Sequence, residues 1–250
     1  MKFENFLASR ILSYKRYKNT ITSPIIKISI LSIIITIIVI NFSVSIGFGI
    51  QNEIRDKFTT FSGNYYISNF KNENFSTYYP IDLNKIDEQF FRSKILKNIN
   101  QVVYNPGIIP VNNTFLDIVF KGIDNNGFNS VSQFLNNKNL VNIKLGEVLV
   151  SEIIAKKLNI KKGDYVKFLF FQDQKSKIPI IRKLKVIEFY NSSISEFDSK
   201  LIFGNIHQSA LINKWDNNFT GGLEVSLENN KLKKEDLDFL FSLIPPDYDI

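Results

Sequence analysis

The stretch that decides the fold is residues 28–52, ISILSIIITIIVINFSVSIGFGIQN, which runs for 25 residues without a charged side chain between Lys27 and Glu53. A helix needs roughly 20 mostly apolar residues to cross about 30 Å of hydrocarbon. We therefore expect a transmembrane helix over residues 24–52. Pro24 falls in its first turn, where a missing N–H costs least. A cleaved signal peptide is the alternative, with Ser43 and Ser45 resembling a small-residue cleavage site, but this apolar run starts late and is long.

The charges that flank this run predict its orientation. The first 27 residues carry one acid, Glu4, against six bases: Lys2, Arg10, Lys15, Arg16, Lys18 and Lys27. Beyond the run, two bases and two acids cancel over residues 53–57. Lys and Arg are retained on the cytoplasmic side of a membrane. We expect the amino terminus to be cytoplasmic, the protein to lie in the inner (cytoplasmic) membrane, and residues 53–250 to form a periplasmic domain.

Composition narrows the classes of function. The chain has no cysteine, so disulfides do not stabilise the outer domain, and about 200 residues suffice for a core of its own. The first 27 residues supply five of the net seven positive charges. The remainder has no basic block interleaved with aromatic residues, so nucleic acid is not an expected partner.

Two features indicate contacts at the membrane. Residues 1–23 read as a cytoplasmic amphipathic helix, because apolar side chains recur at helical spacing over 2–20 opposite basic and polar ones, which is typical of a helix at the lipid interface. Within the apolar run, Ser32, Thr36 and Asn41 are the small or polar residues that mark contacts between transmembrane helices. We expect them to pack against other spans.

The outer domain reads as an α+β layered fold. Ser151 is placed to cap a helix, and residues 159–164 form a turn between that helix and the next strand. We expect strands over 62–70, 101–104, 114–121, 146–151, 165–172, 180–190 and 221–229, and helices over 82–97, 151–158, 205–215 and 233–243, with Asp82 capping the first.

Residues that carry chemistry are few. No phosphate-binding loop is present, so ATP is not hydrolysed by this chain, and we expect no catalytic residue, cofactor or metal site. The single histidine, His207, lies on an expected amphipathic helix, where a structural role is favoured. Glu196 and Asp198 lie close enough in sequence to suggest a carboxylate pair, although capping a turn is the favoured interpretation.

One segment of the outer domain resembles a known family. GEVLVSEIIAKKLNIKKGDYVKF, residues 146–168, resembles a signature in the extracytoplasmic domain of MacB/FtsX-type ABC transporter permeases. The resemblance is carried by Gly146, Ala155, Leu158, Gly163, Asp164 and Val166. Physically, this is a strand, a short helix, a Gly-Asp turn and another strand, with a positive φ expected at Gly163.

Three further segments resemble the lipoprotein-releasing permeases of the LolC/LolE type. They are FLASRILSYKR (6–16), SVSIGFGIQNEI (43–54) and residues 185–229. In the last, the resemblance is carried by Glu196-Phe197-Asp198, Phe203, Gln208, Leu211, Trp215, Gly221-Gly222 and Glu224-Val225. The segments stand in the family's order over nearly the whole chain.

This resemblance implies a function and a set of partners. It implies a permease subunit that releases lipoproteins from the inner membrane to a periplasmic carrier. The partners would be a separate ATPase subunit, a second permease or a second copy, the lipoprotein, the carrier and membrane lipid. In one of the two permease types of this family, an extended hairpin hooks the carrier. The equivalent connection here implies a carrier-binding tip at Gln172, Asp173, Lys175, Lys177 and Pro179.

One feature departs from the family's pattern. Such permeases carry three more transmembrane helices after the outer domain, and this chain ends at Ile250. We therefore expect a fragment or a truncated gene product. The alternatives to a transporter subunit are an FtsX-like transmembrane signalling protein and an anchored extracytoplasmic binding domain.

Overall fold

A computed structural model describes residues 3–4, 6, 22–72, 79–111, 114–140, 142–171, 178–216, 218–228 and 232–249. The chain divides into two compact units, Met1–Arg55 and Asp56–Ile250. The expected amphipathic helix of residues 2–20 lies outside the described residues apart from Phe3, Glu4 and Phe6.

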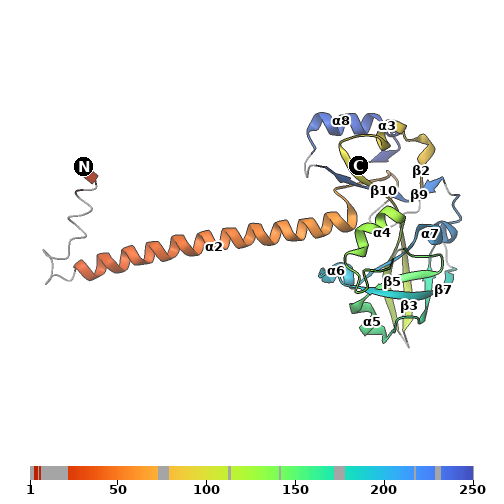
Figure 1. The fold of residues 1–250 in the computed structure, drawn as a ribbon, viewed down its shortest axis with the longest axis horizontal. Helices are drawn as coiled ribbons and strands as arrows, with labels where there is room; N and C mark the ends of the chain where they lie inside the picture. Colours follow the sequence, from red (N-terminus) through yellow and green to blue (C-terminus); the bar gives the residue numbers. More distant parts are fainter. Residues whose placement is uncertain are drawn as a thin grey trace. The chain divides into compact units, whose positions relative to one another are not determined.

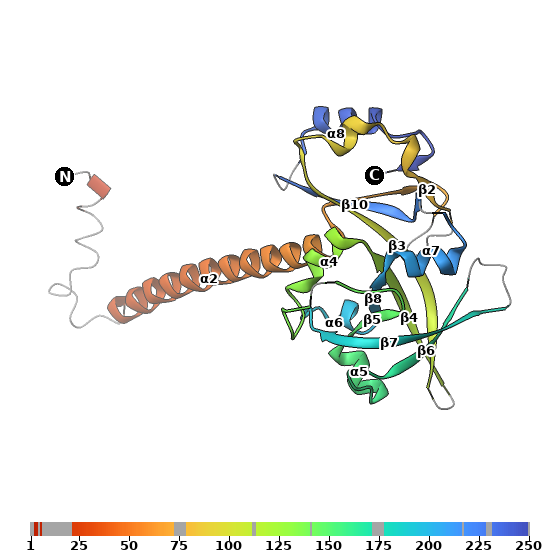
Figure 2. The same ribbon diagram turned by 45° about the vertical axis from the view of Figure 1, so that its right-hand side comes forward.

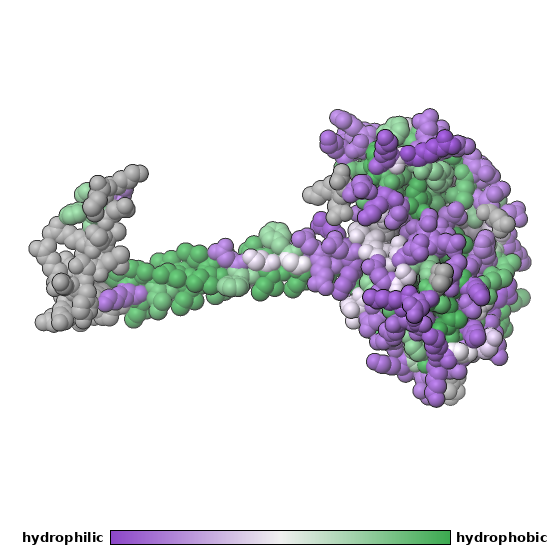
Figure 3. Space-filling view, in the orientation of Figure 1, coloured by the Kyte–Doolittle hydropathy of each residue, from purple (hydrophilic) through white to green (hydrophobic). Residues whose placement is uncertain are grey.

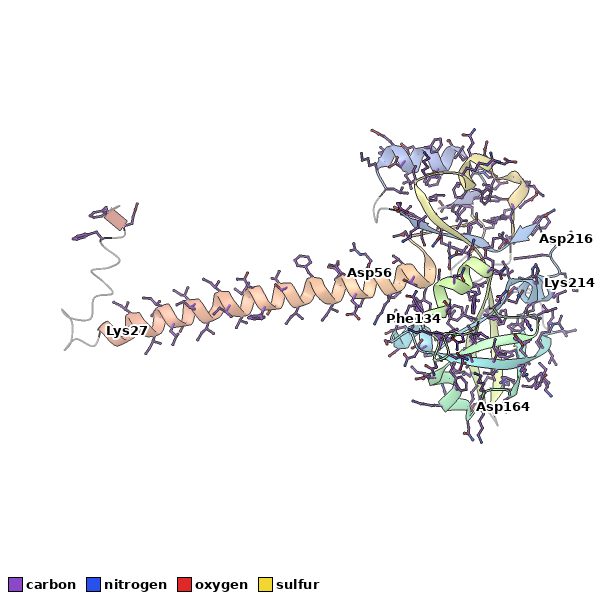
Figure 4. The ribbon with its side chains drawn as sticks, viewed as in Figure 1. Lys27, Asp56, Phe134, Asp164, Lys214 and Asp216 are labelled. Carbon is purple, nitrogen blue, oxygen red and sulfur yellow. The ribbon has the colours of Figure 1, made fainter. Side chains whose placement is uncertain are left out.

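The first unit consists mainly of the long helix α2, Thr22–Ser62, whose last turns belong to the second unit. Its most apolar window has a mean hydropathy of 2.6 and is exposed along its whole length. Figure 4 labels Lys27 and Asp56 on this helix, and Figure 3 shows the apolar surface between them. In the described part of the chain, α2 alone is long and apolar enough to cross a membrane.

The second unit is an α+β domain built on one mixed sheet, with strand order β11-β1-β10-β3-β4-β8-β5-β7-β6. The strands are β1 (Tyr65–Asn69), β3 (Leu96–Val111), β4 (Thr114–Ile123), β5 (Glu147–Ser151), β6 (Tyr165–Phe170), β7 (Ile180–Tyr190), β8 (Leu201–Asn205), β10 (Gly222–Leu227) and β11 (Tyr248–Asp249). A separate pair is formed by β2 (Ile81–Asp82) and β9 (Phe219–Thr220).

Six of these strands close into a barrel, because β3 pairs with β6 as well as with β4. Gly107 faces Phe170 at this closure, and a Cβ at Gly107 would lie 2.9 Å from the Leu169 carbonyl oxygen. Side chains that alternate along β4, β6 and β7 fill the interior, among them Phe120, Phe168 and Phe170. Figures 1 and 2 show these strands wrapped around one another.

Short helices cover the sheet. They are α3 (Glu88–Phe91), α4 (Asn125–Ser132), α5 (Glu152–Leu158), α6 (Ser195–Asp198), α7 (Ile206–Asn213) and α8 (Lys234–Ser242), with a 3₁₀ turn, η2, at Leu83–Lys85. α3 and α8 lie together over β1 and β10, where Phe90 and Leu240 share a core. The Ser151 hydroxyl accepts from the Ile154 N–H and caps α5, as the sequence predicts.

The Gly-Asp turn also forms as expected. Gly163 has a φ of 94°, and the Asp164 carboxylate accepts a hydrogen bond of 2.8 Å from the Lys161 N–H. This turn carries the chain from α5 into β6 and places both β6 and β7 as predicted.

One predicted element is wrong, and another begins later than predicted. The single helix expected over 82–97 is instead η2, α3 and the start of β3, because Asp82 and Asp87 each cap a separate short turn and Leu96 begins pairing with β10. The strand expected over 62–70 begins only at Tyr65, because α2 continues to Ser62. Gly63, with a φ of 69°, then ends the helix, and a Cβ there would lie 2.8 Å from the Val225 carbonyl oxygen.

We predict that α2 spans the membrane with the second unit outside. A single cysteine introduced at the exposed Lys157 should react with a membrane-impermeant thiol reagent in intact spheroplasts, and one at position 10 should react only after lysis. The native chain has no cysteine, so it serves as the unlabelled control. The reverse labelling pattern would contradict this orientation.

Candidate functional site

The last turn of α2 is anchored in the second unit by an aromatic cluster. Phe61 is 2% exposed, and its ring stacks on Phe134, labelled in Figure 4, with centroids 4.4 Å apart. The rings of Phe197 and Phe203 lie 5.7 and 5.9 Å from the same ring. The end of the helix is therefore part of the hydrophobic core of the domain.

A buried ion pair lies directly beneath this turn. Lys121 on β4 and Glu224 on β10 are each 2% exposed, and a Glu224 carboxylate oxygen lies 2.7 Å from the Lys121 ammonium nitrogen. The same ammonium donates a hydrogen bond to the backbone carbonyl of Phe61. The carboxyl end of a helix carries a partial negative charge. Lys121 therefore lies where a cation stabilises the end of α2 most.

Two tyrosines, the half-buried Tyr66 and the buried Tyr104, complete a group that we call the coupling cluster: Tyr66, Tyr104, Lys121 and Glu224. Sheet register assembles it, because Tyr104 faces Lys121 across β3 and β4, and Tyr66 faces Glu224 across β1 and β10. The Tyr104 hydroxyl donates to the Glu224 carboxylate. The ammonium of Lys121 also lies 5.3 Å from the centre of the Tyr104 ring.

Burial dominates the electrostatics of the coupling cluster. It raises the pKa of the Tyr66 and Tyr104 hydroxyls, and the Glu224 carboxylate raises both further. Burial lowers the pKa of Lys121, and Glu224 opposes that shift. Both tyrosines therefore stay neutral, and Tyr104 remains a hydrogen-bond donor to the carboxylate.

A small pocket of about 90 Å³ opens beside the coupling cluster. Ser62, Val119, Phe197 and Leu201 line it, and Lys121 lies at its wall. Its surface is mostly apolar, and its volume suits a few methylene groups rather than a whole metabolite.

The loop before β8 holds one wall of this pocket. The Asp198 carboxylate accepts hydrogen bonds from the N–H and hydroxyl of Ser192, at 3.2 and 2.7 Å, so Asp198 closes the turn as predicted. Burial raises the pKa of Asp198. Glu196 is exposed at the rim, so the adjacent acids have separate environments. This arrangement holds Phe197 against Phe61.

The other predicted residues are placed as follows. His207 is exposed in the first turn of α7, and its N–H donates to the capping side chain of Asn205. Strands β6 and β7 form the predicted hairpin stem, with Pro179 just before β7. Gln172, Asp173, Lys175 and Lys177 lie outside the described residues. No group of three metal-binding side chains gathers among the residues that the structure covers.

The polar residues of the apolar run bond within α2. Ser32, Thr36 and Asn41 donate to the carbonyls four residues earlier, at 2.9, 2.8 and 2.8 Å. The two hydroxyl donors are therefore satisfied within the helix, whereas this bond uses only one of the two N–H groups of the Asn41 amide. Packing of these three residues against other spans stays a prediction, and unchanged co-purification of partner spans after replacing all three would contradict it.

Sequence reasoning missed the coupling cluster. Lys121 lies in the strand segment 117–124, DIVFKGID, where alternation places Ile118 and Phe120 inside the barrel and Lys121 on the opposite face. The sequence offered one signal for the cluster: Lys121 lies on the face of β4 opposite the barrel interior, and that face is also covered. Its partner, 103 residues away, follows only from the sheet register.

No protein-family model matches the sequence, and no curated protein matches it. Among solved structures, the chain is similar to the periplasmic region of MacB from Actinobacillus actinomycetemcomitans, with a TM-score of 0.48 and 14% identity over 74% of this chain and 86% of that one. It is also similar to the extracellular domain of the ABC-type transporter YknZ from Gram-positive bacteria, with a TM-score of 0.46 and 10% identity over 73% and 96% of the two chains. Similarity at this level does not bear on function, which must follow from the chain's own residues.

We predict that Lys121→Met destabilises the outer domain by about 3–5 kcal/mol, because it leaves the Glu224 carboxylate buried without its cation. The double variant Lys121→Met/Glu224→Leu should recover much of that loss, since no charge then remains buried. Urea unfolding of the detergent-solubilised chain measures both.

The matched control is Arg92→Met, which removes a surface pair with Glu88 whose side chains are 79% and 82% exposed. This change should cost less than about 1 kcal/mol. A Lys121→Met loss no larger than that of Arg92→Met would contradict the role assigned to the buried pair.

Proposed function

We propose that this chain is a permease subunit of an ABC transporter of the MacB/FtsX-like superfamily. In this proposal α2 crosses the inner membrane, Asp56–Ile250 is the extracytoplasmic domain, and a separate subunit hydrolyses ATP. The resemblance of the sequence at 6–16, 43–54, 146–168 and 185–229 supports it. The observation that carries it is the anchoring of the last turn of α2, through the Phe61 carbonyl, to a buried lysine of the domain's sheet.

That anchoring suits the transmission of force. A helix joined to a domain by a flexible linker tethers it, whereas a helix whose last turn is packed and bonded in the core moves with it. Helix α2 runs from Thr22 to Ser62 without a break, so its bonded end and its apolar run are parts of one element. A displacement of the span by the ATPase would therefore be passed to β4 and β10.

We further propose that the cargo is a lipoprotein and that the transporter releases it to a soluble periplasmic carrier. The support is the resemblance to LolC/LolE-type permeases, together with the hairpin formed by β6 and β7. In this proposal the tip of the hairpin, residues 172–179, contacts the carrier. Lys175 and Lys177 would attract an acidic surface.

The proposal predicts that a stiff connection is needed for transport. Residues 52–55 should be replaced by four glycines, and by four alanines in the matched control, so that length and charge are the same in both. Glycine destabilises a helix interior by about 1 kcal/mol per residue relative to alanine. We expect both variants to co-purify with the ATPase, and only the alanine variant to release lipoprotein from membranes.

Three outcomes would count against this account. Equal release by the glycine and alanine variants would contradict the transmission of force through α2. Failure of the native chain to co-purify with any ATPase would contradict the permease assignment and favour an anchored binding domain. A complex that hydrolyses ATP without releasing lipoprotein would favour the signalling role.

The hairpin proposal has a separate test. Deleting residues 173–178 should leave the outer domain folded, because the paired strands β6 and β7 lie outside the deletion, and should abolish crosslinking to the carrier. Lys175→Ala/Lys177→Ala should weaken crosslinking, whereas the control Lys156→Ala/Lys157→Ala on α5 should not. Crosslinking that persists after the deletion, or a domain that unfolds, would rule out the carrier-binding tip.

A further inference from the structure

Strand β3 has a free edge over its first residues. It pairs with β10 over Leu96–Val102 and with β4 only from Val102 onward. In the described chain, residues 96–101 therefore have a neighbouring strand on one side only. An unpaired edge presents N–H and C=O groups to which another extended segment can bind.

The backbone of Ile99 faces this free edge. Gln101 turns away from β10, because its C=O accepts a 3.3 Å bond from the Asp124 N–H and its N–H donates to the Asp124 carboxylate at 3.1 Å. Alternate residues of an antiparallel strand point their backbone groups the same way, so those of Ile99 face the same side. There the Asn126 side chain donates to the Ile99 carbonyl at 3.3 Å, and that carbonyl retains a second lone pair.

Two clefts meet at this edge. One, of about 270 Å³, is lined by Asn64, Asn98, Ser130 and Ser226. The other, of about 360 Å³, is lined by Phe91, Ile99, Gln101 and Asn126. Both include Lys97 and Asn98, so the free edge runs between them. An added strand would send its alternate side chains into one cleft and then the other.

The chemistry of the clefts selects for neutral polar side chains. Amide and hydroxyl groups dominate the lining of the 270 Å³ cleft, and amides of Asn98, Gln101 and Asn126 face the other. The carboxylate of Asp124 is already occupied by the N–H groups of Gln101 and Gly127. Lys97 alone adds a cation.

The length of the edge is limited at both ends. Asp124 closes it at Gln101. At the other end, the pairing shifts by a residue between Ser226 and Leu227, leaving Lys97 as a bulge. A bulge and a lysine are the features that stop open-ended pairing of edge strands. The edge therefore suits a short segment.

We propose that residues 97–99 of β3 bind a short, extended, neutral polar peptide segment of a partner protein as an added strand. Main-chain hydrogen bonds to Ile99 would supply affinity, and the two clefts would select the side chains. This goes beyond the proposed function and does not depend on it, because an anchored domain of any role would present the same edge.

A fluorescence titration tests the proposal on the full chain in detergent. Asn129→Cys on α4, carrying an environment-sensitive fluorophore, reports on the clefts, and Ser242→Cys on α8 is the distant control. The probe is an acetylated and amidated hexapeptide of alternating serine and asparagine. We expect a saturable signal at the first position only, weakened about tenfold when alternate backbone nitrogens of the peptide are methylated.

A matched pair of variants isolates the backbone bond. Ile99→Pro removes the N–H on the free side and keeps the bonds to β10, whereas Ile99→Ala removes the side chain and keeps the N–H. Only the proline variant should lose binding, and thermal unfolding checks that both are folded. No signal with the peptide, an equal signal with the methylated peptide, or equal binding by the two variants would overturn the proposal. Saturation by chitotriose instead would overturn it in favour of a glycan.

Discussion

The interaction on which the rest of the structure depends is the ion pair between Lys121 and Glu224, which also binds the Phe61 carbonyl at the end of α2. A buried charge is tolerated only when a partner and hydrogen bonds compensate for the loss of water. Here that requirement joins three elements that are far apart in sequence: the end of α2, β4 and β10. Moving β4 or β10 would leave a charge buried without its partner, and moving the end of α2 would take a hydrogen-bond acceptor away from the buried ammonium.

This constraint explains why the helix end belongs to the domain. The Phe61 ring stacks on the Phe134 ring, and the Phe61 carbonyl accepts a hydrogen bond from the Lys121 ammonium. Apolar packing and a polar bond therefore both hold the last turn of α2 in the domain. The closed barrel next to it, sealed where β3 meets β6, gives β4 a stiff base. At the small pocket lined by Ser62 and Phe197, a contact from outside would reach both the helix end and α6.

Local patterns predicted local structure well. The uncharged run at 28–52 is helical throughout, and alternation correctly placed the strands at 165–170 and 180–190. The Gly163-Asp164 turn and the Ser151 cap formed because each depends on a few adjacent residues. The failure over 82–97 has the opposite cause, since pairing of Leu96 with β10 overrode the local preference for helix.

The candidate site was not predictable in the same way. In the sequence, Glu224 stood out only as part of the family resemblance. Lys121 lies in an alternating strand, and nothing next to it in sequence indicates a buried ion pair. The order β10-β3-β4 in the sheet brings them together, and the pairing of β10 with β3 joins distant segments of the chain. The free edge at 97–99 is likewise a property of register. It exists because β4 pairs with β3 only from Val102 onward.

The most direct test of the central claim is amide hydrogen exchange in the last turn of α2, compared between the native chain and Lys121→Met. The account predicts that the N–H groups of residues 60–63 exchange as slowly as those of β4 in the native chain. In Lys121→Met they should exchange at least about tenfold faster relative to β4, because the helix end opens before the barrel does. Native exchange at 60–63 as fast as in an unprotected helix end, or no change relative to β4 in the variant, would contradict the claim that this lysine anchors the helix.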